Sequence, residues 1–136
     1  MRKTFFLLAV LFSVALFTNC GGGDDATGVA EKFAKSYLVD HDVNEYAKYL
    51  DEKTRNAVLD PGMAEYNKEQ QEKAKALKFK YTIDKEQSLI NESGASICFN
   101  ITSETDPNFK QNSRVDLKQD LDGKWFVNYY TFPTRF

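Results

Sequence analysis

The chain has 136 residues and a formal net charge of −2, with 18 Lys and Arg against 20 Asp and Glu. Its basic residues interleave with acidic ones, so the clustered basic surface that nucleic-acid binding requires is missing and no nucleic-acid partner is expected. The length suits a single domain with a modest hydrophobic core.

The first 19 residues have the pattern of a secretory leader. Arg2 and Lys3 precede an uncharged run, residues 4–18, that is mostly Phe, Leu, Val and Ala. A bilayer-spanning helix needs about 20 apolar residues, whereas the apolar core of a signal peptide has about 7–15. We therefore predict a signal peptide over residues 1–19. Removing these 19 of 136 residues leaves 117, with 16 basic and 20 acidic side chains and a net charge of −4.

The end of this leader, Leu16-Phe17-Thr18-Asn19-Cys20, resembles a bacterial lipobox, in which small residues precede an acylated cysteine. Thr18 fits that pattern, and Phe17 and Asn19 depart from its commonest form. The resemblance implies lipidation of Cys20 and a protein anchored by its lipid in the bacterial cell envelope, at the outer membrane on its periplasmic or surface face. The alternative is an ordinary signal peptide with an incidental cysteine. Glycines 21–23 favour a flexible tether over residues 20–26.

Helical periodicity follows the tether. A helix is expected to begin near Asp25 or Thr27, either of which can cap its free amides, and further helices are expected over 43–50, 51–59 and 60–77. Asp60-Pro61 is typical of a helix start. The polar middle of the last segment, residues 67–75, predicts an exposed helix with Glu–Lys pairs. The expected inward stripe of the first helix is Val29, Ala30, Phe33, Ala34, Tyr37 and Leu38.

After Lys78 the apolar period changes from 3.6 to 2. Alternating segments cover residues 78–84, 95–102, 114–118 and 125–129, and Asp122-Gly123 is a strong hairpin signal. Four strands with one apolar face each predict an antiparallel sheet. Helices followed by a sheet give an α+β fold, with N-terminal helices packed on a four-stranded antiparallel sheet in one domain over residues 27–136.

Three segments carry a resemblance to a known superfamily: Tyr37 to Asn44, Glu45 to Glu52, and the closing stretch Leu117 to Val127. Together they resemble the nuclear transport factor 2-like (cystatin-like) superfamily, and the lipobox in front is similar to a domain-of-unknown-function branch of small lipoproteins. The resemblance implies a curved sheet that wraps around helices to form a cone with a pocket. Members include enzymes, binders and dimerisation modules, so the fold alone does not settle function.

Enzymes of this superfamily place an Asp, Glu or His inside the cone, where burial tunes its pKa. The inward positions of this chain carry none, so no catalytic residue and no cofactor are expected. An acid–base enzyme remains a minor alternative that requires Asp84 or Asp116 to turn inward. His41, the single histidine, is expected at a solvated corner far from the cavity, and no metal site is expected. Cys98 is expected to be a small buried strand residue.

The favoured function is a non-catalytic domain that binds a small apolar or aromatic ligand. Plain core packing is the alternative role for its candidate lining residues, which are Phe33, Tyr37, Tyr81, Trp125 and Tyr129. The last strand is apolar on both faces, which favours an interface with a second copy or another partner. The second hypothesis is therefore an interaction module, a homodimer or a partner-docking domain, that binds no ligand. Burial under the chain's own loops is the alternative for these residues, which are Phe126, Tyr130 and Phe132.

Overall fold

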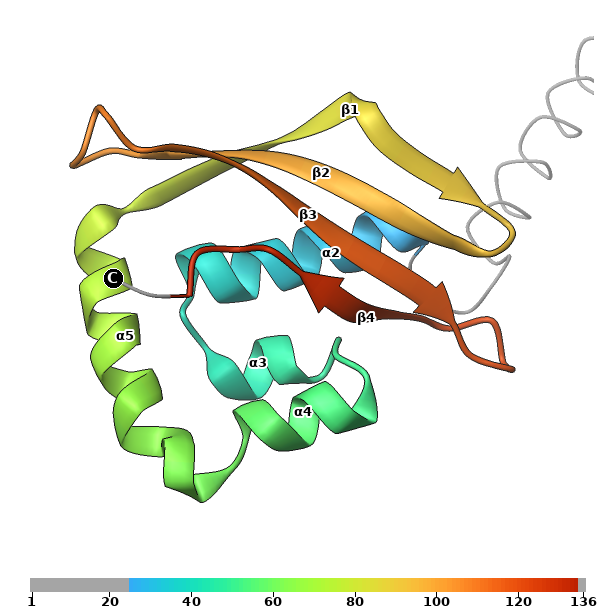
Figure 1. The fold of residues 1–136 in the computed structure, drawn as a ribbon, viewed down its shortest axis with the longest axis horizontal. Coiled ribbons are helices and arrows are strands. Elements are labelled where there is room, and N and C mark those ends of the chain that lie inside the picture. Colours follow the sequence, from blue (N-terminus) through green and yellow to red (C-terminus); the bar gives the residue numbers. More distant parts are fainter. Residues whose placement is uncertain (1–24, 135–136) are drawn as a thin grey trace, which may run out of the picture.

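The computed structural model describes residues 25–134, and in this part of the chain the helices precede the sheet (Figure 1). The predicted signal peptide, Cys20 and residues 20–24 of the tether lie outside the described residues. The helical elements are α2 (Ala26–Ala34), the π-helix η1 (Lys35–Val39), α3 (Val43–Ala47), α4 (Glu52–Val58), the 3₁₀ turn η2 (Pro61–Met63) and α5 (Ala64–Leu77). The strands are β1 (Phe79–Asn91), β2 (Gly94–Ser103), β3 (Lys110–Gln119) and β4 (Trp125–Tyr130).

The sheet is antiparallel with strand order β1-β2-β3-β4, which confirms the predicted α+β class and its four-stranded curved sheet. Because each strand of this antiparallel sheet reverses the chain direction, the first and third connections lie at the same end of the sheet. We call the end that carries the β1–β2 turn (residues 91–94) and the β3–β4 turn (residues 120–124) the hairpin end. The β2–β3 connection (residues 104–109) lies at the opposite end, beside the C-terminus of α5, and we call this the α5 end (Figure 1).

Helix α2 fills the inner face of the sheet. Asp25 caps it by accepting a hydrogen bond from the amide of Gly28 at 2.7 Å. The predicted stripe is buried except for Tyr37, which is partly buried, and Phe33 and Ala30 are both fully covered. Ala26 is helical and 1% exposed, so the predicted tether extends two residues too far, because Asp25 and Ala26 already belong to the folded domain.

Helix α2 and η1 together run from one end of the sheet to the other. Val29, near the start of α2, lines a groove with Trp125 and Phe126 at the hairpin end. Leu38, in η1, lies with Lys78 and Glu104 at the α5 end. The start of α2 therefore lies at the hairpin end.

A short segment between α3 and α4 covers the outer edge of β4. The amide of Val127 donates to the carbonyl of Tyr49 at 2.7 Å, and the amide of Asp51 donates to the carbonyl of Val127 at 2.9 Å. Asp51 also caps α4 by accepting from the amide of Thr54. The carboxylate that starts a helix thus belongs to the same segment that closes the sheet edge.

Strand β4 contains a bulge that the sequence did not reveal. Val127 pairs with Leu117 and Tyr129 pairs with Asp116, so Asn128 is an extra residue. The bulge reverses the alternation, and Tyr130 instead of Tyr129 lies beside Val115 on the inner face. The prediction that Tyr129 shares a face with Trp125 and Val127 is therefore wrong.

Strand β1 is longer than the predicted segment 78–84. Its pairing with β2 shifts between Asp84 and Leu89, where the apolar alternation is lost, and then resumes to Asn91. The thiol of Cys98 lies on the outer face of the sheet and donates to the carbonyl of Gln87 at 3.3 Å. The prediction of a buried Cys98 is wrong, because its neighbours Ile97 and Phe99 occupy the inner positions.

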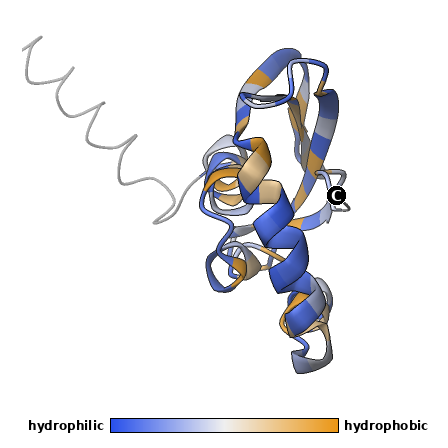
Figure 2. Ribbon diagram, turned by 90° about the vertical axis from the view of Figure 1, so that its left-hand side faces the viewer, coloured by the Kyte–Doolittle hydropathy of each residue, from blue (hydrophilic) through white to orange (hydrophobic). Residues whose placement is uncertain are grey.

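Helix α5 begins as predicted from Asp60-Pro61, although one 3₁₀ turn precedes it. The carboxylate of Asp60 accepts from the amide of Gly62 at 2.9 Å. The helix ends at Leu77 and is followed by Lys78, whose φ of 48° is left-handed. Figure 2 shows α5 as mostly hydrophilic, and Ala74 is its buried residue. The helix therefore contributes little to the core.

Candidate ligand pocket

A pocket of about 250 Å³ lies between α5 and the rest of the domain, and we call it the α5 pocket. Helix α5 is attached near both of its ends. The amide of Asn67 donates to the carbonyl of Val58 at 3.2 Å. At the other end, the hydroxyl of Ser103 donates to the carbonyl of Leu77, and that of Thr105 donates to the carbonyl of Ala76 at 2.8 Å. The middle of α5 forms one wall of the pocket.

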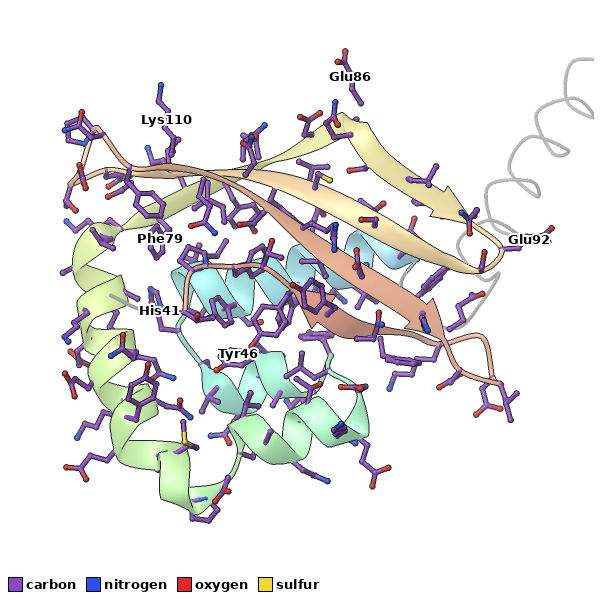
Figure 3. The ribbon with its side chains drawn as sticks, viewed as in Figure 1. His41, Tyr46, Phe79, Glu86, Glu92 and Lys110 are labelled. Carbon is purple, nitrogen blue, oxygen red and sulfur yellow. The ribbon has the colours of Figure 1, made fainter. Side chains whose placement is uncertain are left out.

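The pocket walls come from segments that are distant in sequence (Figure 3). Helix α5 supplies Tyr66, Asn67, Gln70, Gln71 and Ala74. The facing wall consists of Tyr37, His41, Tyr46, Val58, Phe79, Tyr130 and Thr134. These lining residues include no Asp, Glu, Lys or Arg.

Tyrosine rings dominate the facing wall. The ring centroids of Tyr37 and Tyr46 are 4.9 Å apart, and those of Tyr37 and Tyr130 are 5.5 Å apart. The hydroxyl of Tyr37 donates to the carbonyl of Pro133 at 2.9 Å. Within residues 25–134 the hydroxyls of Tyr46, Tyr66 and Tyr130 have no hydrogen-bond partner. Three phenol groups are therefore free to bond to water or to a ligand.

Burial keeps these phenols protonated. Loss of hydration raises the pKa of Tyr37 well above its usual value, and the neighbouring hydroxyls of Tyr130 and Tyr46 raise it further because two phenolates would repel. Burial likewise raises the pKa values of Tyr46 and Tyr130. At physiological pH each of these tyrosines is a neutral hydrogen-bond donor.

His41 belongs to this pocket, which corrects the prediction that it lies far from any cavity. Its φ of 51° turns the chain between η1 and α3 and brings the residue opposite α5 (Figure 3). Burial is the main effect that lowers the pKa of His41, and Lys75 adds to it, whereas Asp40 and Glu72 act in the opposite direction. The imidazole is therefore mainly neutral at pH 7.

The predicted lining residues do not form one site. Tyr37 lines the pocket, but Phe33 is fully buried in the core. Tyr81 is half-buried against Phe99, with ring centroids 5.8 Å apart. Trp125 lies in the groove at the hairpin end. Tyr129 is 51% exposed on the outer face, with the Arg114 guanidinium 5.5 Å from its ring centroid.

The predicted interface residues also separate. Phe132 is 3% exposed and stacks on Phe33 with centroids 5.6 Å apart, and Tyr130 lines the pocket. Phe126 lies in the groove at the hairpin end. Phe132 is therefore buried by the chain itself, which was the alternative to an interface. Tyr130 is turned inward by the bulge at Asn128.

The α5 wall was not predicted as part of a site. The expected Glu–Lys pairs are present, at 2.9 Å for Glu69 with Lys73 and 3.1 Å for Glu72 with Lys75. The inner side presents Tyr66, Gln70 and Ala74 at helical spacing to the pocket. This stripe was the sequence feature that could have indicated a pocket wall. Because it is polar, it looked like a surface that faces solvent.

Asp84 and Asp116, the carboxylates that an acid–base enzyme would need inside the cone, lie on the outer face of the sheet. Asp116 accepts from the hydroxyl of Ser96 at 2.8 Å and pairs with Arg114 at 3.2 Å on the outer face. Asp84 pairs in register with Cys98 on the same face. In residues 25–134 no three His, Cys, Asp or Glu side chains gather to hold a metal ion.

No known protein family, no curated protein and no solved structure shows significant similarity to this chain. Among residues 25–134, none of the helices combines the length and apolar character needed to cross a membrane.

Proposed function

We propose that this protein is a lipid-anchored protein of the bacterial cell envelope that binds a small uncharged molecule in the α5 pocket without transforming it. The observation that carries the proposal is the chemistry of the pocket wall. It has no charged side chain, and three of its phenol hydroxyls have no partner among the described residues.

The wall limits the chemistry of the ligand. A charged molecule would lose its hydration and find no opposite charge, a cost of several kcal/mol. The hydroxyls of Tyr46 and Tyr130 can donate to an acceptor such as a carbonyl or ether oxygen, and the apolar surfaces of Val58 and Phe79 can cover a ring. The ligand class is therefore a neutral, ring-containing molecule with hydrogen-bond acceptors.

The pocket volume limits the size of the ligand. A volume of about 250 Å³ corresponds to about eight water molecules and falls just below the roughly 300–1,000 Å³ of sites for drug-sized ligands. A molecule of one or two rings matches this space.

The anchored location and the superfamily belong to the same proposal. The leader and Cys20 support the location, and the order of helices, antiparallel sheet and pocket is compatible with the nuclear transport factor 2-like (cystatin-like) resemblance. Mass spectrometry of the native protein tests the anchor, since a Cys20 without acyl chains would contradict it.

Binding can be tested with two probes of the same shape. The mature chain carrying Cys20→Ser is titrated with 2-acetylnaphthalene, which is neutral, and with 2-naphthoate, which is anionic, and amide shifts are followed by NMR. We expect the neutral probe to shift the amides of Gln70, Gln71 and Ala74 and to bind at least about tenfold more tightly. Equal binding of the two probes, or shifts outside the pocket, would overturn the proposal.

Single hydroxyl deletions provide the matched control. Tyr46→Phe and Tyr130→Phe each remove a donor from the pocket and should weaken binding of 2-acetylnaphthalene by about three- to tenfold. Tyr129→Phe makes the same chemical change on the outer face and should leave the affinity unchanged. If Tyr129→Phe weakened binding as much as Tyr46→Phe, the probe would not occupy the α5 pocket.

A further inference from the structure

Three large apolar side chains remain exposed at the hairpin end. Leu89 and Ile90, at the end of β1, are 61% and 54% exposed, and Leu121 in the β3–β4 turn is 107% exposed. Leu89 pairs with Ser96 and Ile90 pairs with Ala95, so both faces of the first hairpin present an apolar side chain. These three residues, the hairpin triad, project beyond the packed core.

The chain enters the domain at the same end. Val29, one turn into α2, lies in a groove with Trp125 and Phe126 next to the β3–β4 turn. Five residues separate Cys20 from Ala26 in the sequence. A chain spans at most about 3.6 Å per residue, so Ala26 lies within roughly 20 Å of Cys20.

The α5 pocket lies at the opposite end. Helix α2 and η1 together comprise the 14 residues from Ala26 to Val39, which correspond to roughly 20 Å of helix. Figure 3 shows Glu92 at the tip of the first hairpin and Phe79 at the far end of the sheet, beside His41 of the pocket. One end of the domain is therefore close to Cys20, and the ligand site is remote from it.

We propose that the hairpin end docks on the bilayer that holds the lipid of Cys20, with the hairpin triad in contact with its apolar boundary and the α5 pocket directed away from it. This inference rests on the lipid anchor of the proposed function. The anchor keeps the domain at a high effective concentration beside the membrane, so contacts too weak to recruit a free protein suffice to orient a tethered one.

The charges at this end specify the kind of surface. Residues 91–94 and 120–124 carry three carboxylates, from Glu92, Asp120 and Asp122, against the single ammonium of Lys124. An anionic surface would repel these turns, whereas a zwitterionic one would not. Trp125, next to the turn, is of the residue type enriched at membrane interfaces. The expected occupant is therefore a zwitterionic lipid surface.

The orientation can be measured in the mature protein, purified with its native modification and reconstituted into phosphatidylcholine vesicles with nitroxide-labelled headgroups. In a Cys98→Ser background, a fluorophore is attached at Glu92→Cys or at Asn108→Cys, two exposed turn positions at opposite ends of the sheet. We expect quenching at position 92 to be at least about twice that at position 108, and this ratio to fall when anionic lipid is added. Equal quenching in phosphatidylcholine would overturn the proposal.

Variants separate docking from the effect of a short tether. Leu89→Ser, Ile90→Ser and Leu121→Ser together should bring the quenching ratio close to one, and Leu121→Ser alone, in a fully exposed turn, should lower it partway. The matched triple Val39→Ser, Leu59→Ser and Met63→Ser, at residues 41–49% exposed elsewhere, should leave it unchanged. If the hairpin triple kept the wild-type ratio, the tether alone would orient the domain and the docking proposal would fail. A protein that does not float with the vesicles would refute the lipid anchor itself, and with it this inference.

Discussion

The aromatic cluster beneath the sheet has a phenylalanine half and a tyrosine half. Phe33, Phe99 and Phe132 are at most 3% exposed, with Phe132 stacked on Phe33 and edge-on to Phe99. Tyr37 and Tyr130 touch the same Phe33 ring, with centroids 5.9 and 5.1 Å away, but their far sides face the pocket. Rings of both halves contact one another at similar centroid distances. The tyrosine hydroxyls lie at the boundary between the core and the pocket.

This difference teaches that one helical stripe can serve two purposes. Phe33 and Tyr37 are four residues apart and point to the same side of the α2–η1 segment. The first contributes to stability by burial, and the second contributes a polar boundary. Variants at the two halves should therefore affect stability and binding separately.

The largest effect is expected from truncating the phenylalanine half. Phe33→Ala removes a fully buried ring and should lower the free energy of unfolding by about 3–5 kcal/mol, because it leaves a cavity. Tyr66→Ala, at a pocket residue that is 43% exposed, should change it by about 0.5 kcal/mol or less. Urea unfolding monitored by circular dichroism measures both. Equal losses would mean that α5 is part of the core.

Removing one hydroxyl should have a smaller effect. Tyr37→Phe breaks the hydrogen bond to the carbonyl of Pro133 and should cost about 1 kcal/mol of stability. Tyr130→Phe removes a hydroxyl without a partner among residues 25–134, and its free energy of unfolding should stay within about 0.5 kcal/mol of the wild type. The same urea experiment compares them, and a larger loss for Tyr130→Phe would contradict the assignment of a free hydroxyl.

Alkaline pH should destabilise the tyrosine half. Burial raises the pKa of Tyr37 above the value of about 10 in the unfolded chain. The unfolded state therefore releases its proton first, and stability that is fully present below pH 10 declines as the pH rises above it. By pH 11 the loss due to Tyr37 should be about 1.4 kcal/mol. Urea midpoints at pH 8–11 measure the decline, which should be shallower in Tyr37→Phe than in Tyr129→Phe.

Mild acid should have the smallest effect, through His41. Its pKa is lowered in the folded state, so stability is present above pH 6.5 and falls as the pH decreases below that value, when the unfolded chain takes up the proton. His41→Asn removes the titration and keeps a residue that tolerates positive φ. Thermal unfolding between pH 5 and 7.5 should therefore show a weaker pH dependence in His41→Asn. An unchanged dependence would mean that other groups cause it.

The sequence predicted the elements whose apolar pattern is regular. The stripe of Val29, Phe33 and Leu38 predicted α2, and the alternation of Ile97, Phe99 and Ile101 predicted β2 and its inner face. Periodicity works for these elements because each buries a single face against the same core. The predicted lipidation of Cys20 concerns a residue outside the described part of the chain, so the lipid and the envelope location stay predictions.

The pocket could not be predicted for physical reasons. Asn128 adds one residue to β4, and nothing in its identity marks a bulge, so Tyr129 and Tyr130 exchanged their predicted faces. The wall of α5 is polar because it faces a pocket, and a polar helix face looks the same when it faces solvent. His41 reaches the pocket through a left-handed backbone conformation that is uncommon outside glycine.

The segment that covers β4 has a consequence for copies of this domain at high local concentration. Tyr49 and Asp51 occupy both outward backbone hydrogen-bonding groups of Val127, so an approaching chain cannot pair with β4 at this residue. On the opposite side, β1 is interrupted between Asp84 and Leu89, which spoils the flat template that intermolecular β-pairing needs. Copies of this domain can thus meet often without joining their sheets into a polymer.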